Sequence, residues 1–174
     1  EGLCAGDEAV YRYAMDWCAH MVQRPARPAE VALVFRGGKG TGKSTFGDAL
    51  ARIAGRHGMT TSSSDLLTGR FNDHLRDVLV LISDEAASPY DRGGEARLKG
   101  MITQRMVTYE GKGRDAVLGK NMLHIVLLSN DGWVVPASLK DERRFMVQDV
   151  DPKFAGDGAF FDALHRELEA GGHS

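Results

Sequence analysis

The sequence predicts an α/β fold in which one parallel sheet carries helices on both of its faces. Three apolar runs of strand length lie at 31–35, 77–83 and 122–129, and such runs are typical of strands that are buried on both faces. Helix-compatible segments alternate with these runs, which favours parallel strands. A glycine-rich loop directly follows the first run, where open α/β sheets bind ligands. The 174 residues suffice for one domain with a substantial core.

Charge and cysteine content narrow the class of protein. The net charge of −2 and the isoelectric point near 6.3 exclude a uniformly basic surface, so any contact with nucleic acid has to be local. Cys4 and Cys18 suggest neither a metal site nor a disulfide framework. No apolar run approaches the roughly 18 residues of a membrane span. We therefore expect a cytoplasmic protein with no membrane partner and, because residue 1 is Glu, a piece of a longer protein.

The region ahead of the first strand is predicted to be an amphipathic helix over 7–22. Its apolar residues recur at spacings of three and four, which places them on one helix face. Pro25 and Pro28 then break this periodicity and lead the chain into the strand at 31–35. We divide the chain into three parts, which are an N-terminal helical appendage (1–30), a core (31–150) and a C-terminal helix packed on the core (151–174).

The rest of the chain alternates between helical and extended segments. Turn residues and apolar periodicity set their limits. In chain order we predict a helix over 45–56, a turn with a short strand at 57–64, a brief helix over 65–71, the strand at 77–83, a helix over 95–104, a hairpin of 106–110 with 116–118, the strand at 122–129, a last strand over 144–150 and a helix over 158–170.

The loop at 37–44 reads GGKGTGKS and fits the phosphate-loop pattern GxxxxGK[ST] in full. Its glycines let backbone N–H groups point at a polyphosphate, and the following helix adds its positive N-terminus. Lys43 is expected to reach the β- and γ-phosphates, and Ser44 to ligate Mg²⁺. A chance Lys-Ser in a flexible loop is the weaker interpretation, because the match lies between a strand and a helix. The predicted nucleotide-binding residues are Gly37, Gly38, Lys39, Gly40, Thr41, Gly42, Lys43, Ser44 and Thr45.

Polar side chains also follow the two later apolar runs, at the edge where parallel sheets bind ligands. Asp84 is placed to hold Mg²⁺ together with Ser44, and Glu85 to orient or deprotonate the attacking water. Asn130 is placed to sense the γ-phosphate and that water. A solvated strand-end turn is the simpler alternative for each, and for Asn130 in isolation it would be favoured. The nearby phosphate loop favours the functional interpretation.

Arg143 and Arg144 stand just before the last predicted strand. A guanidinium at this place could extend across a subunit interface and stabilise charge that develops on the γ-phosphate of a neighbouring subunit. The alternative is a solvated pair at a sheet edge, and composition alone leaves the two interpretations about equal. Both residues therefore stay candidates for an arginine finger.

The segment 97–120 is locally basic, with six basic and two acidic residues and hence four excess positive charges. Within it, the predicted hairpin carries Lys112 and Arg114 at a glycine-thinned tip, and Lys120 follows. Such a hairpin could enter the channel of a ring and grip the phosphates of single-stranded nucleic acid without reading its bases. An ordinary mobile surface hairpin is the alternative.

Four segments taken together resemble the superfamily 3 helicase domain. They are GGKGTGKST at 37–45, LISDEA at 81–86, IVLLSND at 125–131 and ERRFMVQDV at 142–150. The segments GRFNDHLRD at 69–77 and NMLHIVLLSNDGWVVPA at 121–137 more closely resemble the helicase part of phage and prophage primase-helicase proteins. The resemblance covers about 31–150, which we identify as a helicase-like ATPase core.

The resemblance implies a P-loop NTPase core of the AAA+ type, with a parallel sheet of strand order 5-1-4-3-2. It implies ATP and Mg²⁺ as cofactors, a homo-oligomeric ring that is a hexamer in the full-length protein, and movement along single-stranded DNA. A primase domain or partner, in a phage- or prophage-encoded protein of the bacterial cytoplasm, is implied as well. The implied roles fall on Lys43, Ser44, Asp84, Glu85 and Asn130 in the pocket, on Arg144 or its neighbour Arg143 as the finger, and on Lys112, Arg114 or Lys120 as the DNA contact.

We therefore predict an ATP-hydrolysing DNA helicase or translocase domain. Two other functions share the phosphate loop. A P-loop small-molecule kinase would also need an acceptor pocket and an arginine-bearing lid, which the sequence does not show. An ATP-dependent nucleic-acid-binding assembly switch has little use for a water-activating base such as Glu85.

Overall fold

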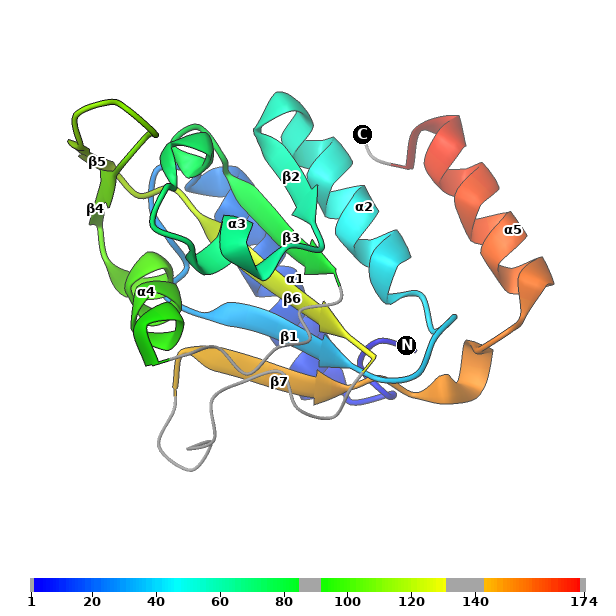
Figure 1. Cartoon of the computed structure of the whole chain (residues 1–174). Helices are drawn as coiled ribbons and strands as arrows, with labels where there is room; N and C mark the ends of the chain where they lie inside the picture. Colours follow the sequence, from blue (N-terminus) through cyan, green and yellow to red (C-terminus); the bar gives the residue numbers. More distant parts are fainter. Residues whose placement is uncertain (1, 85–91, 131–142, 173–174) are drawn as a thin grey trace.

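The computed structural model describes residues 2–84, 92–130 and 143–172 (Figure 1). Its strands are β1 (Ala32–Arg36), β2 (Gly58–Thr61), β3 (Val80–Asp84), β4 (Met106–Tyr109), β5 (Val117–Lys120), β6 (His124–Ser129) and β7 (Phe145–Asp149). Its α-helices are α1 (Glu8–Gln23), α2 (Lys43–Ala54), α3 (Ser64–Thr68), α4 (Arg92–Thr103) and α5 (Gly158–Glu167). Short 3₁₀ turns form η1 (Gly55–His57), η2 (Asp73–Leu75) and η3 (Pro152–Phe154), and a π-helical segment forms η4 (Leu168–Gly172). In these ranges, no helix is long and apolar enough to cross a membrane.

Five strands form one parallel sheet in the order β2-β3-β6-β1-β7. Counted along the chain as strands 1 to 5 of this sheet and read from the β7 edge, the order is 5-1-4-3-2. The register of β1 pairs Val34 with Leu127 of β6 on one side and with Val147 of β7 on the other. Because every pairing is parallel, all five strands end at the same edge of the sheet. The prediction of an α/β fold with a parallel sheet is confirmed.

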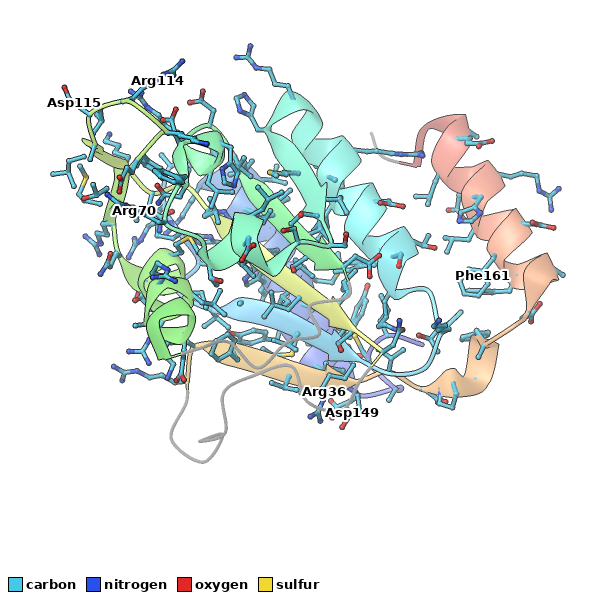
Figure 2. All side chains as sticks on the ribbon, viewed as in Figure 1. Arg36, Arg70, Arg114, Asp115, Asp149 and Phe161 are labelled. Atoms are coloured by element: carbon cyan, nitrogen blue, oxygen red, sulfur yellow. The ribbon has the colours of Figure 1, made fainter. Side chains whose placement is uncertain are left out.

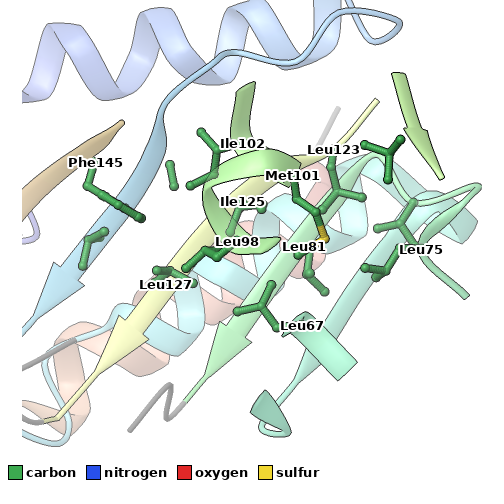
Figure 3. Close-up of a cluster of buried hydrophobic side chains, with 14 of the residues drawn as sticks. Leu67, Leu75, Leu81, Leu98, Met101, Ile102, Leu123, Ile125, Leu127 and Phe145 are labelled. Atoms are coloured by element: carbon green, nitrogen blue, oxygen red, sulfur yellow. The ribbon is translucent and has the colours of Figure 1, made fainter. Parts of the chain in front are cut away.

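Both faces of this sheet are covered by helices. On one face, α3 and α4 pack through Leu67, Leu98 and Ile102 against the fully buried Leu81 and Leu127 (Figure 3). The strands alternate their side chains between the two faces, so the neighbouring residues of the same strands face the opposite layer.

The opposite layer consists of α1 and α2. Trp17 and Met21 of α1 and Leu50 of α2 join one apolar cluster with the strand residues Phe35 and Ile82. The indole N–H of Trp17 donates to the carbonyl oxygen of Val31 at 2.8 Å. Residues 1–30, which we expected to be an appendage, therefore contribute α1 to the core layer itself.

Several element boundaries differ from the sequence prediction, and two of these differences have clear local reasons. Helix α2 begins at Lys43 rather than residue 45, because Gly42 takes a left-handed conformation with φ 90° and caps the helix. Strand β3 begins at Val80 rather than residue 77. The residues before it are engaged elsewhere, since the N–H of Val78 donates to Leu75 in a turn and that of Leu79 to His57.

A histidine pair, the half-buried His20 and the buried His124, lies between α1 and the amino ends of the strands. His124 is 1% exposed, and its Nδ1 lies 3.0 Å from the carbonyl oxygen of Met122. Because a carbonyl oxygen only accepts, we assign the ring proton to Nδ1, so that Nε2 accepts from Nδ1–H of His20 at 3.3 Å. Burial lowers the pKa of His124 to about 4, and His20 adds to this shift.

We expect the protein to lose stability as the pH falls from 6.5 towards 4. Above pH 6.5, His124 is neutral in both states. Below pH 6.5, His124 becomes protonated in the unfolded chain, whereas in the folded protein it stays neutral down to about pH 4. At pH 5 this lowers the free energy of unfolding by about 2 kcal/mol relative to neutral pH. Urea unfolding at pH 7.5 and at pH 5 measures this difference in the free energy of unfolding.

The matched variant for this measurement is His124→Asn, which keeps a donor near the position of Nδ1 and does not titrate. It should lose less stability than the wild-type protein between the two pH values, whatever its stability at pH 7.5. An identical pH dependence in variant and wild type would show that other groups carry the effect.

Candidate functional site

A pocket of about 570 Å³ lies at the edge of the sheet where the parallel strands end. Its residues come from the loop after β1, the ends of β2, β3 and β6, and the chain around the start of α5. They are Lys39, Gly40, Thr41, Gly42, Lys43, Ser44, Thr45, Ser62, Asp84, Asn130, Gly156, Gly158, Phe161 and His165. The pocket thus gathers the glycine-rich loop with the polar strand ends that the sequence prediction selected.

The local conformation of the loop requires glycine at two positions in particular. Gly40 and Gly42 have φ of 72° and 90°, a region that side-chain-bearing residues rarely adopt. A Cβ atom on Gly42 would also lie 3.1 Å from the ring of Phe161. The loop therefore turns tightly around the pocket and leads directly into the first turn of α2, whose N–H groups have no helical partner.

Lys43 is held inside the curve of this loop. Its side chain is largely buried, and its Nζ donates to the carbonyl oxygens of Gly37 at 2.7 Å and Gly38 at 2.8 Å. Thr41 accepts a third bond at 3.2 Å. Burial lowers the pKa of Lys43, and the nearby Asp84 carboxylate opposes this shift. The ammonium group is thus preorganised at the pocket by the loop's own oxygens.

A hydrogen bond joins the start of α2 to the end of β3. The hydroxyl of Ser44 donates to Oδ2 of Asp84 at 2.8 Å. Helix α2 can approach the sheet this closely because Gly47 lies against it. A Cβ atom on Gly47 would be 2.7 Å from Cγ2 of Ile82. The sequence placed Ser44 and Asp84 in one metal site, and the structure brings their oxygens within hydrogen-bond distance.

The residues available to a divalent cation are therefore one hydroxyl and one carboxylate. Over the described ranges, no group of three or more His, Cys, Asp or Glu side chains is arranged to hold a metal. Mg²⁺ is usually held by one or two carboxylates together with phosphate oxygens and water, rather than by a full protein cage. Ser44 and Asp84 fit that mode of binding, in which a bound nucleotide supplies the missing ligands.

Of the other two residues predicted for the pocket, the structure describes one. Asn130 follows β6 and lines the pocket with an exposed side chain. Glu85, predicted to orient the attacking water, lies outside the described residues.

Arg143 and Arg144 lie at the amino end of β7, away from the pocket of their own chain. The N–H of Ala32, at the start of β1, donates to the carbonyl oxygen of Arg144 at 2.8 Å. At the other end of the same strand pair, Arg36 forms an ion pair with Asp149 at 2.9 Å, near the edge that holds the pocket (Figure 2). The two candidate finger residues and the pocket thus lie at opposite ends of the parallel strands.

The predicted basic hairpin forms as β4 and β5, which pair antiparallel. Lys112 and Arg114 lie in its connecting loop, which projects from the side of the molecule away from α5 (Figures 1 and 2). Lys120 ends β5 at the base of the hairpin, opposite Met106. The structure therefore separates the three predicted nucleic-acid contacts into two at the tip and one at the base.

The segment 70–73, which ends on the first residue of η2, contacts and braces this hairpin. Asn72 makes two side-chain bonds to it, donating to the carbonyl oxygen of Thr108 at 3.1 Å and accepting from the N–H of Glu110 at 2.8 Å. Arg70 forms an ion pair with Glu110 at 2.8 Å, and Arg114 lies 3.6 Å from Asp73. The hairpin is consequently fixed to the chain that follows α3.

Sequence reasoning missed the pocket residues outside the motifs. Ser62 follows β2, a strand placed only loosely in the sequence. Phe161 and His165 come from α5, whose apolar stripe predicted a packed helix without indicating what it packs against. Only the spatial position of α5 beside the loop identifies them.

The fold and the pocket define an α/β protein whose parallel sheet carries a phosphate-loop motif and a serine–aspartate pair at one edge. Within that class, the chain belongs to the family of unknown function DUF5906, which matches residues 35–144.

Two related comparisons extend this assignment. The chain is 28% identical over 137 residues to the DNA primase-polymerase of Nitratiruptor phage NrS-1, a match that spans 76% of this chain and 19% of that protein. It is also similar to the apo structure of the NrS-1 C-terminal region, with a TM-score of 0.72 and 26% identity, over 86% of this chain and 36% of that one. The chain thus corresponds to only a part of each relative.

A more distant structure shares the fold. JCV helicase matches with a TM-score of 0.56 and 18% identity, over 93% of this chain and 45% of that one.

Proposed function

We propose that this chain is the ATP-hydrolysing motor domain of a phage-type replication protein, with a P-loop core of the AAA+ type as in superfamily 3 helicases. The observation that carries the proposal is the meeting of Lys43, Ser44, Asp84 and Asn130 in one pocket. The strand order supports the AAA+ assignment. The similarity to a phage primase-polymerase supports a role in replication, with a primase as a domain or partner of the same protein.

The loop and α2 would bind the phosphates of ATP. The N–H groups at the start of α2 and the turns at Gly40 and Gly42 would face an anion bound in the pocket. Lys43 would exchange its bonds to carbonyl oxygens for bonds to the β- and γ-phosphates. This exchange favours the bound state, because an ammonium–phosphate contact is stronger than one to a neutral carbonyl.

Ser44 and Asp84 would hold Mg²⁺, which neutralises charge on the phosphates when it is bound. Their hydrogen bond already keeps both oxygens together. Glu85 would accept a proton from the attacking water, and Asn130 would orient that water beside the γ-phosphate. The pocket thus offers Ser44, Asp84 and Asn130 for three of these roles, and Glu85 directly follows Asp84 in the sequence.

The hydrolytic site would be completed by a second subunit of a homo-oligomeric ring, which we propose is a hexamer in the full-length protein. Arg144, or its neighbour Arg143, lies at the edge of the sheet opposite to its own pocket. A heterologous, head-to-tail arrangement of subunits can bring that edge to the pocket of the next subunit. Hydrolysis would then depend on assembly.

The braced hairpin would contact the backbone of single-stranded DNA through Lys112, Arg114 or Lys120. We expect Arg114→Ala to weaken binding of single-stranded DNA about equally for different sequences. The slope of log K against log salt should also fall by about 1, because one phosphate contact is lost. Fluorescence anisotropy at several salt concentrations measures both effects.

A matched control for the hairpin is Arg12→Ala, which removes an exposed positive charge from α1, where Arg12 pairs with Glu8. It should leave the salt slope unchanged. If Arg12→Ala and Arg114→Ala lower the slope equally, the hairpin has no special part in binding.

Steady-state ATP hydrolysis, measured over a range of protein concentrations with and without single-stranded DNA, tests the proposed function. Turnover per subunit that rises with concentration and with DNA supports a motor assembled at subunit interfaces. Turnover per subunit that depends on neither protein concentration nor DNA favours a self-contained enzyme such as a small-molecule kinase. ATP binding with no turnover at any concentration favours an assembly switch.

A further inference from the structure

A second cavity continues the phosphate pocket between α2 and α5. Its volume is about 300 Å³, and Thr45 and His165 line both it and the larger pocket. Beyond these two residues it is bordered by Asp48 and Arg52 of α2 and by Glu169 of the chain after α5. The two cavities therefore adjoin, and we refer to them together as a groove that begins at the glycine-rich loop and follows α2.

The helix geometry explains why this groove exists. Thr45, Asp48 and Arg52 are spaced by three and four residues and share one side of α2. Phe161 and His165 are spaced by four on α5. The ring of Phe161 lies on the side of α5 that faces the loop and α2, where it meets Gly42 (Figure 2). This contact seats the start of α5 against the loop, and the groove opens between the two helices beyond it.

The charges of the two cavities differ in sign. Lys39, Lys43 and Asp84 leave the larger pocket with one excess positive charge, to which the start of α2 adds its positive end. Asp48, Glu169 and Arg52 leave the second cavity with one excess negative charge. Phosphates therefore favour the larger pocket. An uncharged group rich in hydrogen-bond donors suits the second cavity, since carboxylates only accept.

We propose that this second cavity receives the nucleoside of the bound triphosphate, with His165 at the junction between phosphates and sugar. The inference rests on the proposed nucleotide binding and adds its orientation. The γ-phosphate lies towards Asp84 and Asn130, and the ribose and base lie between α2 and α5. Asp48 and Glu169 accept hydrogen bonds from the ribose hydroxyls or the amino group of the base, and α5 forms the outer wall of the nucleotide site.

Two probes separate this inference from the proposed function. A non-hydrolysable ATP analogue fills both cavities, whereas inorganic tripolyphosphate fills only the larger one. With Mg²⁺ present, calorimetric titration of His165→Ala should show the analogue binding about five- to tenfold more weakly, the loss of about one hydrogen bond or stacking contact. Its affinity for tripolyphosphate should match the wild type. Asp48→Asn should show the same selective loss.

Arg166→Ala is the matched control, because Arg166 is exposed on α5 and its Nε–H donates to the carbonyl oxygen of Asp162 in the same helix. It should bind both probes like the wild type. Unchanged affinity of His165→Ala and Asp48→Asn for the analogue, or equal losses for both probes, would overturn the nucleoside site and leave the proposed function standing. If the wild-type protein binds neither probe, both proposals fall.

Discussion

Lys43→Ala is expected to lower kcat/KM for ATP hydrolysis by about a hundredfold or more. The ammonium of Lys43 is the positive group that the loop fixes at the pocket. Removal of one preorganised donor to developing negative charge typically lowers rates by about 100- to 1,000-fold. Because the same group would also bind the ground-state phosphates, affinity for the nucleotide should fall as well. Coupled-enzyme assays and calorimetric titration measure the two effects.

The structure supplies a control within the same loop. Lys39 also lines the pocket but is exposed, so its charge is screened by water and holds no fixed place. Lys39→Ala should reduce turnover far less than Lys43→Ala. A Lys43→Ala protein that unfolds at the wild-type temperature and hydrolyses ATP at the wild-type rate would exclude a phosphate-binding role for the loop.

The fold was largely predictable because buried parallel strands have a simple sequence signature. The runs that became β1, β3 and β6 are mainly apolar, since both faces of each strand are covered. Their order in the sheet has no such signature. Hydrophobic periodicity says which residues are buried but not which strand lies beside which, so the order came from the resemblance alone.

The candidate site was predictable to the extent that it follows the strand ends. Ser44 and Asp84 are 40 residues apart, yet both follow strands of one parallel sheet, and topology brings them to the same edge. His20 and His124 show the limit of this reasoning, because they are 104 residues apart and no sequence pattern links the two. The place of Phe161 and His165 in the pocket was likewise not predictable from the sequence. Their helix follows the last strand, and nothing local in it specifies a place beside the loop.

Arg144→Ala is expected to reduce kcat for ATP hydrolysis by about 1,000-fold while ATP binding is retained, since an arginine finger acts on the transition state and contributes about that factor. About five residues of β7 separate Arg144 from the edge that holds the pocket, roughly 17 Å at the rise of a strand. A side chain so placed cannot serve its own pocket. Turnover and equilibrium binding of ATP, measured on the same preparation, give the two quantities.

Mixing two inactive variants tests directly whether the finger acts between subunits. In an assembly of Lys43→Ala with Arg144→Ala, an Arg144→Ala subunit has an intact pocket, and a Lys43→Ala neighbour offers it an intact finger. With equal amounts and random assembly, about one quarter of the interfaces combine both, so activity should return to at most that share of the wild-type value. If Arg143 is the finger instead, Arg144→Ala alone keeps its turnover, and the recovery appears when Arg143→Ala is mixed with Lys43→Ala. No recovery in either mixture would contradict hydrolysis shared between subunits, because head-to-tail interfaces necessarily create some complete sites when both variants enter one ring.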